Sequence, residues 1–249
     1  SYDAWAVGNF GEWTAKVGPS TPANAKTGGL FSSATYPTQG QNFAFTLVEP
    51  TNNWITQEIL EANPSLNAHG GSKYLASFYK YNPDSETDEF YDADNWLISP
   101  NLSGKKQTVS FWVSNNNTDT EQYPETFDVL YTKEGTDLDK FVKIGDTHTA
   151  SSGAWEEVSV EIPEGATHFA IHQNTSNATN FMFQVDDFSY EAGSGKVTGY
   201  KVYRNGELLK TLGADKTEFT DDTVERGKTY IYAVSAVFAD GESEVTVAN

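Results

Sequence analysis

The pair Asp186-Asp187 interrupts a strand pattern and is the first candidate for chemistry. From Phe181 to Val185 every second side chain is apolar and points to one face, whereas Phe188 and Tyr190 continue on the other parity. This shift of phase predicts a β-bulge that turns one of the two carboxylates toward the buried face. A buried carboxylate is unfavourable unless a cation or hydrogen-bond donors meet its charge. The pair is therefore a candidate cation site; the alternative is an aspartate that caps a turn or accepts backbone N–H bonds without a metal.

A second group of polar residues gives weaker signals. Asp92, Asp94 and Asn95 form half of a calcium-loop pattern, but the glycine and the closing glutamate of an EF-hand do not follow. We interpret this segment as a solvated acidic loop. His168 and His172 lie four residues apart on a predicted strand. That spacing separates them by roughly 13 Å, too far to share one ion, so both are expected on the surface.

Three tryptophans are candidates for ligand contact: Trp112, Trp54 and Trp155. Trp112 falls on the polar parity of its strand, and the other two fall at strand ends or in loops. Exposed aromatic rings offer flat apolar platforms on which sugar rings can stack. The alternative for Trp112 is that the C-terminal residues or the segment 49–68 cover it, and the sequence leaves both interpretations open.

Catalytic motifs give no support for an enzyme. The sequence contains no G-x-S-x-G elbow, no H-E-x-x-H, no P-loop and no Rossmann fingerprint. Carboxylates are plentiful because the chain is acidic, so a glycoside-hydrolase pair stays open as an alternative. We predict a protein without catalytic activity.

The elements that must position these residues are strands. Val109, Phe111 and Val113 alternate with polar-face residues, which is typical of a strand with one buried face. Similar segments recur about every 10–15 residues with turn residues between them, which favours a β-sandwich or jelly roll over βαβ units. The only helical spacing runs from Trp54 to Ala62, where one short helix ending before Pro64 is expected.

The composition changes near residue 192 and divides the chain in two. Residues 192–195 are a linker by composition. Alternating strands are expected after it over 199–204, 207–212, 217–220, 229–238 and 243–247, and the hairpin signal Asn205-Gly206 joins the first two. Residues 1–192 hold 9 Lys and Arg against 26 Asp and Glu, a net charge of −17; residues 193–249 hold 7 against 9, a net charge of −2. We predict a jelly-roll domain over 1–192 and a small β domain over 193–249.

Bulk properties exclude several classes of protein. The formal net charge of −19 argues against a nucleic-acid partner, which would need clustered Lys and Arg. The absence of cysteine excludes disulfides, thiolate zinc sites and a cysteine nucleophile. No apolar run approaches the roughly 20 residues of a membrane-spanning helix. No basic segment followed by an apolar one opens the chain, so we expect that any signal peptide has been removed.

An ordered set of segments resembles the cleaved-adhesin, or choice-of-anchor J, family, which includes the jelly-roll modules of gingipain and haemagglutinin proteins. In family order the segments are HGGSKYLA (69–76), DNWLISPNL (94–102), VSFWV (109–113), FDVLY (127–131), Trp155, IPEGATHFAIH (162–172) and VDDF (185–188). The resemblance covers roughly residues 1–190. It implies an all-β, galactose-binding-like jelly-roll sandwich that carries structural calcium.

The same resemblance suggests the calcium ligands. In a jelly roll the start of the chain pairs beside the last strand, which would bring Asp3 to Asp186 and Asp187. The family pattern also has a glutamate just before the Ser-Tyr-Asp segment. We therefore expect Asp3, Asp186 and Asp187 to be metal ligands.

The C-terminal residues resemble the later strands of a fibronectin type III module. The matching segments are GYKVYRNGE (199–207) and TYIYAVSAV (229–237). The 57 residues are too few for the first two strands of such a module and their tryptophan.

The resemblance predicts a secreted or cell-surface adhesion module. Its expected partner is a host protein, another surface protein or a glycan, and the expected oligomeric state is open. The alternative is a carbohydrate-binding module of a polysaccharide-degrading system; a glycoside hydrolase is a further alternative.

Overall fold

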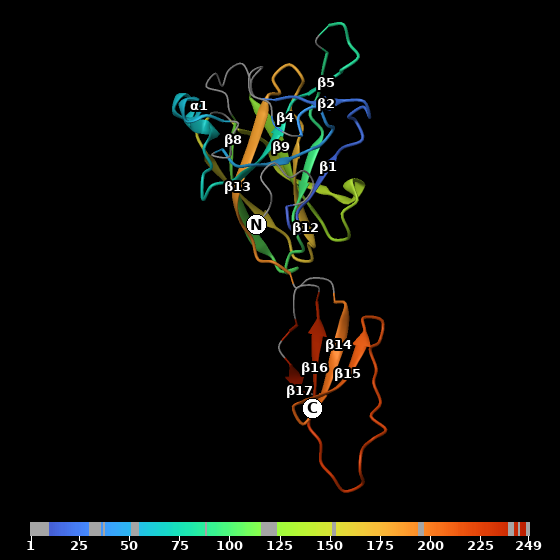
Figure 1. Ribbon diagram of the computed structural model, residues 1–249. Helices are drawn as coiled ribbons and strands as arrows, with labels where there is room; N and C mark the ends of the chain where they lie inside the picture. Colours follow the sequence, from blue (N-terminus) through green and yellow to red (C-terminus); the bar gives the residue numbers. More distant parts are fainter. Residues whose placement is uncertain are drawn as a thin grey trace. The chain divides into compact units, whose positions relative to one another are not determined.

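The computed structural model describes residues 10–29, 36, 38–50, 55–87, 89–115, 124–150, 153–193, 197–238, 242–243 and 245–247. The chain divides into two compact units, Ser1–Ala192 and Gly193–Asn249. We call them the N-terminal and the C-terminal unit and describe each by itself. Figure 1 labels their elements.

The N-terminal unit is a sandwich of two antiparallel five-stranded sheets. The first contains, in spatial order, β1 (Thr14–Val17), β7 (Asn95–Ile98), β12 (His168–Gln173), β9 (Glu125–Thr132) and β10 (Val142–Ala150). The second contains β11 (Glu156–Ile162), β8 (Gln107–Asn115), β13 (Met182–Ser189), β4 (Tyr74–Phe78) and β3 (Thr46–Val48). From β7 to β13 the chain crosses repeatedly from one sheet to the other, as in a jelly roll. The predicted fold class is confirmed.

Short elements flank the two sheets. A small sheet contains β2 (Lys26–Thr27), β5 (Lys80–Tyr81) and β6 (Phe90–Tyr91), and the helical elements are α1 (Gln57–Ala62), η1 (Pro64–Leu66) and η2 (Leu138–Lys140). The Thr56 hydroxyl caps α1 by accepting the N–H of Ile59 at 3.3 Å. The predicted helix is confirmed, although Pro64 opens a 3₁₀ turn after it. No helix in the described ranges is both long and apolar enough to span a membrane.

Each sheet buries its inner face and part of its outer face. Val109, Phe111 and Val113 point into the core between the sheets, as their alternation predicts. In β7, Leu97 joins this core, whereas Trp96 and Ile98 belong to a second cluster that Leu138 and Phe141 help to cover. This explains why Trp96, Leu97 and Ile98 are all apolar: both faces of β7 are buried.

The predicted bulge lies in β13. Asp186 pairs with Trp112 and Ser189 with Ser110, so two residues of β13, Asp187 and Phe188, oppose the single residue Phe111 of β8. Asp187 has a φ of 46°, in the left-handed region. The bulge re-aims the side chains that follow it, which places Phe188 and Tyr190 against the core.

The C-terminal unit is one antiparallel sheet with a long extended connection. In spatial order the sheet contains β15 (Glu207–Gly213), β14 (Gly199–Arg204), β16 (Tyr232–Val237) and β17 (Thr246–Val247). Asn205-Gly206 forms the predicted hairpin turn between β14 and β15. The expected strand over 217–220 is wrong, because these residues pair with no described strand.

Candidate functional site

His69 contacts three residues that lie far from it in the sequence. It lies in the connection between η1 and β4, and its imidazole stacks on the outer-face side chain Trp112 with ring centroids 3.8 Å apart and planes 14° apart. Trp155, just before β11, meets the same imidazole at 6.1 Å and 64°. We call His69, Trp112, Trp155 and Asp187 the His69 stack.

Asp187 supplies the charge of this stack. Its Oδ2 lies 2.6 Å from Nδ1 of His69, with 44% of the Asp187 side chain and 30% of the His69 side chain exposed. A carboxylate at this distance favours the tautomer in which Nδ1 carries the proton and donates. Within the described part of the chain no group hydrogen-bonds Nε2 of His69, so this atom is left for solvent or a ligand.

Asp186 accepts backbone hydrogen bonds from the loop that carries His69. Its Oδ2 accepts the N–H groups of His69 at 2.9 Å and of Gly70 at 3.1 Å, and its Oδ1 accepts the N–H of Asp187 at 2.9 Å. Burial raises the pKa of Asp186 and the charge of Asp187 adds to this, whereas the backbone donors act in the opposite direction. Asp186 is thus the buried aspartate of the bulge, but it lies on the outer face of the sheet opposite Trp112 and not toward the core, where we expected it. The loop covers it there, and it fixes the backbone that presents His69.

Glycine is required at the centre of this loop. A Cβ placed on Gly70 would lie 2.3 Å from Oδ2 of Asp187. Gly71 adopts a φ of 64°, which a side chain would disfavour. Gly70 thus lets the loop approach Asp187 closely, and Gly71 supplies the left-handed backbone conformation next to it.

The described residues supply only part of a calcium site. Calcium takes six to eight oxygen ligands, whereas the carboxylates of Asp186 and Asp187 already accept N–H groups. No group of three or more acids and histidines gathers for a metal among the residues with described positions. Asp3, the third predicted ligand, lies outside those residues. The hydrogen-bond pattern matches the alternative in which an aspartate of the pair accepts backbone N–H bonds.

Two of the three candidate tryptophans belong to the His69 stack. Trp112 and Trp155 are both half-buried and share His69, and Nε1 of Trp155 donates to the carbonyl of Asn67 at 3.1 Å. The segment that covers one face of Trp112 is therefore the loop with His69, one residue beyond the segment 49–68 that we considered. Trp54 lies outside the described residues. His69 itself was missed, and its only signal was its place in the HGGSKYLA segment.

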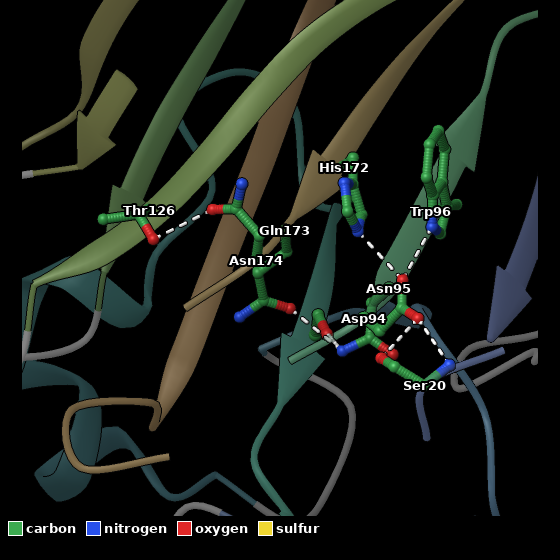
Figure 2. A network of polar contacts seen from close by, with 9 residues as sticks. Ser20, Asp94, Asn95, Trp96, Thr126, His172, Gln173 and Asn174 are labelled. Atoms are coloured by element: carbon green, nitrogen blue, oxygen red, sulfur yellow. Dashed lines mark hydrogen bonds and ion pairs between the residues drawn. The ribbon is translucent and has the colours of Figure 1, made fainter. Parts of the chain in front are cut away.

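A second stack of the same composition lies on the first sheet (Figure 2). His172 stacks on Trp96 with centroids 4.0 Å apart and planes 16° apart. Oδ1 of Asp94 accepts the indole N–H of Trp96 at 2.8 Å and lies 2.9 Å from Nε2 of His172. Its Oδ2 accepts the N–H of Ser20 at 3.0 Å and the hydroxyl of Ser20 at 2.6 Å. We call Asp94, Trp96 and His172 the Asp94 stack.

The Asp94 stack corrects two predictions. Asp94 and Asn95 are 7% and 0% exposed, so this part of the acidic segment is not a solvated loop. Burial alone would raise the pKa of Asp94, but the hydrogen bonds from His172, Ser20 and Trp96 outweigh it and hold this pKa well below its usual range. His172 is not a free surface residue. It shares the outer face of β12 with Ala170, which is buried in the cluster that contains Trp96.

A buried acid inside the sandwich was also missed. Glu125 is fully buried, and its Oε2 accepts the hydroxyl of Thr175 at 2.6 Å and the amide of Gln173 at 2.8 Å. Its Oε1 accepts the N–H of Phe181 at 2.6 Å. Burial raises the pKa of Glu125 to about 7 even though these donors favour the charged form. Through Gln173 this network continues to Asn95 and Asn180.

The His69 stack combines aromatic rings with polar groups. The imidazole and Trp112 are nearly parallel and Trp155 is inclined to them, while Asp187 and Nε2 of His69 give an acceptor and a second polar atom beside the rings. Small-molecule and sugar sites combine apolar area with a few placed polar groups in this manner.

Comparisons with known proteins identify the family. The sequence pattern of the Cleaved Adhesin Domain matches residues 50–190, more than half of the chain. The K2 cleaved adhesin domain of Lys-gingipain is 17% identical, with 76% of this chain and 94% of that chain covered and a TM-score of 0.49.

Two further solved structures are similar. The K1 cleaved adhesin domain of Lys-gingipain from Porphyromonas gingivalis W83 is 17% identical, with 74% and 99% covered and a TM-score of 0.45. The CBM22-2 xylan-binding domain from Paenibacillus barcinonensis is 12% identical, with 74% and 94% covered and a TM-score of 0.37. No curated protein sequence matches. On the match over residues 50–190, the chain belongs to the Cleaved Adhesin Domain family.

Proposed function

We propose that this protein is a non-catalytic, extracellular adhesion module that binds a glycan or a surface protein through the His69 stack. The observation that carries the proposal is the stacking of His69 on Trp112 at 3.8 Å beside an exposed carboxylate. Family membership supports a binding role rather than a catalytic one. Secretion or surface display follows from this role and is part of the proposal.

The stack is suited to binding because its parts are held before a ligand arrives. Asp186 fixes the loop backbone and Trp155 is tied to the carbonyl of Asn67. Preorganised rings and polar atoms lose little conformational freedom on binding, which raises affinity for a given contact area. Hydroxyl or amide groups of a ligand would bond Asp187 and Nε2 of His69 while an apolar face rests on the rings.

Calcium remains a prediction for the region of the bulge. A metal held by Asp3, Asp186 and Asp187 would need further oxygens, since these three supply only part of a calcium shell. Thermal melting with and without a chelator tests it directly. An unchanged melting temperature would remove the metal from the proposal.

A glycan array together with immobilised cell-surface proteins tests the binding role. We expect His69→Ala and Asp187→Asn to lower affinity for the ligand at least tenfold. The matched controls are His168→Ala and Asp146→Asn, which change the same residue types away from the stack. Equal binding by all four variants and the wild type would contradict the assignment of the site.

A further inference from the structure

The C-terminal unit is unusual because it buries almost nothing. Three of its described residues are buried: Gly199, Val202 at 6% exposure and Ser235 at 1%. An antiparallel sheet of this size needs a layer packed on its apolar face to be stable. Among the described residues of the unit, no such layer covers the apolar face.

The two faces of its sheet differ sharply. On one face Glu242 accepts hydrogen bonds from Lys201, Tyr203 and Ser235. The other face carries the apolar or aromatic residues Tyr200, Val202, Leu212, Tyr232 and Val234, which line a groove of about 660 Å³. The register shift between Val202 and Tyr203 puts Leu208 opposite Tyr203, on the face of Glu242. The groove face is thus the one that offers apolar area to a partner.

One wall of the groove is an irregular segment whose backbone is unpaired. Residues 216–221 line the groove beside the sheet. Residues 217–222 belong to the long connection after β15 in Figure 1, and in the described part of the chain they form no backbone–backbone hydrogen bond. A strand of six residues is about 20 Å long, the length of an ordinary strand. An unpaired backbone of this length has N–H and C=O groups to offer to an incoming extended segment.

The charge of the wall specifies the chemistry of that segment. Residues 214–224 contain four acids and one lysine. Asp221 pairs with Arg204 at 2.9 Å and Asp215 with Lys216 at 3.1 Å. Glu218 and Asp222 have no ion pair among the described residues. Their charges favour a partner with basic residues at the positions that face the wall.

We propose that this groove binds an extended strand of a partner polypeptide in which apolar residues alternate with lysine or arginine. The strand pairs its backbone with residues 217–222 and lays its apolar side chains on Val202, Leu212 and Val234. The proposal concerns a surface separate from the His69 stack and does not depend on it.

A designed peptide tests the proposal on the full chain. The probe is a labelled peptide of about eight residues, the length of a typical added strand, in which valine alternates with lysine. We expect saturable binding by fluorescence anisotropy, weakened at least tenfold by N-methylation of alternate peptide amides and by replacement of its lysines with glutamate.

Two groove variants and one matched control locate the site. Leu212→Glu on the floor and Phe219→Glu on the wall should each weaken binding at least tenfold. Leu208→Glu changes the same residue type in the same strand but on the opposite face, and should leave binding unchanged. Circular dichroism checks that each variant is folded, and Phe219→Glu, which lies outside the sheet, retains the test if Leu212→Glu unfolds.

Several results would overturn the proposal. Absence of binding would mean that other residues of the chain fill the groove. Equal loss in Leu208→Glu would place the contact elsewhere. Self-association of the wild type that Leu212→Glu abolishes would make a second copy the occupant instead.

Discussion

The His69 stack and the Asp94 stack use the same three residue types for different ends. In both, a histidine lies flat on a tryptophan at 3.8 Å or 4.0 Å and an aspartate holds the imidazole. The side chains of Asp94 and His172 are 10% and 19% exposed, whereas those of Asp187 and His69 are 44% and 30% exposed. The same combination of Asp, His and Trp is thus a buried structural contact, which we call a structural joint, in the first sheet. In the second sheet it is accessible to solvent.

The number of donors explains the difference. Asp94 receives hydrogen bonds from Trp96, His172 and Ser20, which together replace the water that it has lost. Among the described residues the carboxylate of Asp187 is bonded by His69 alone, and 44% of its side chain is exposed. Interactions strengthen as the local dielectric falls, so the buried trio contributes more to stability. The exposed trio keeps polar atoms free for a ligand.

The largest expected effect is at Asp94. Asp94→Ala leaves the indole of Trp96, the imidazole of His172 and the N–H of Ser20 without their acceptor. Breaking such a buried charged network lowers the free energy of unfolding by about 4 kcal/mol. Urea denaturation followed by circular dichroism measures this change. A loss no greater than that of Asp187→Ala would contradict the comparison.

The pH dependence of Asp94 provides an independent check. Its folded-state pKa lies well below the unfolded value because of its hydrogen bonds. The stability from this group is therefore present above about pH 4, the unfolded pKa, and is lost as the pH falls through the folded pKa. Asp94→Asn should flatten the acid limb of the stability curve.

Glu125 is the opposite case to Asp94. The effect of burial on its pKa is larger than the effect of its hydrogen-bond donors. Its folded-state pKa of about 7 exceeds the ordinary value of 4.5. The stability from this group is therefore complete below pH 4.5 and is lost as the pH rises through 7, on the order of 3 kcal/mol in all. We expect Glu125→Gln to remove this decline, measured by urea denaturation between about pH 4 and 8. A wild-type curve that rises over this interval would contradict the assignment.

The sequence predicted local features better than distant contacts. The parity shift around Asp186-Asp187 predicted the bulge, because strand alternation is a property of neighbouring residues. The burial of Asp94 could not be inferred, because its partners Ser20 and His172 are 74 and 78 residues away in the chain. Acidic neighbours made the segment look solvated until those donors were in place.

The same limit applies to the candidate site. Trp112 and Trp155 were identified from their parity and position, but the residue that joins them, His69, lies in a loop without periodic pattern. Its place is set by Asp186 across a separation of 117 residues. In the C-terminal unit, alternation predicted the strands of the sheet but also a strand over 217–220, where no second strand is available for pairing among the described residues.

The two histidines should differ in their effect on stability. His172→Ala removes a bond to buried Asp94 and a ring on Trp96, and should lower the free energy of unfolding by about 2 kcal/mol. His69→Ala removes exposed contacts and should cost about 0.5 kcal/mol. Urea denaturation of both variants, with His168→Ala as control, gives the difference. Equal losses would mean that the His69 stack is also a structural joint.

The smallest effect on stability is expected at Asp187, where the effect on binding should be clear. Asp187→Asn keeps the size of the side chain and an acceptor for the proton of His69, so the free energy of unfolding, measured with chelator present, should change by less than about 0.5 kcal/mol. The substitution removes the charge that faces a ligand, so affinity should fall while stability does not. A variant that loses both would place Asp187 with Asp94 among the structural acids, and the distinction between the two stacks would then be lost.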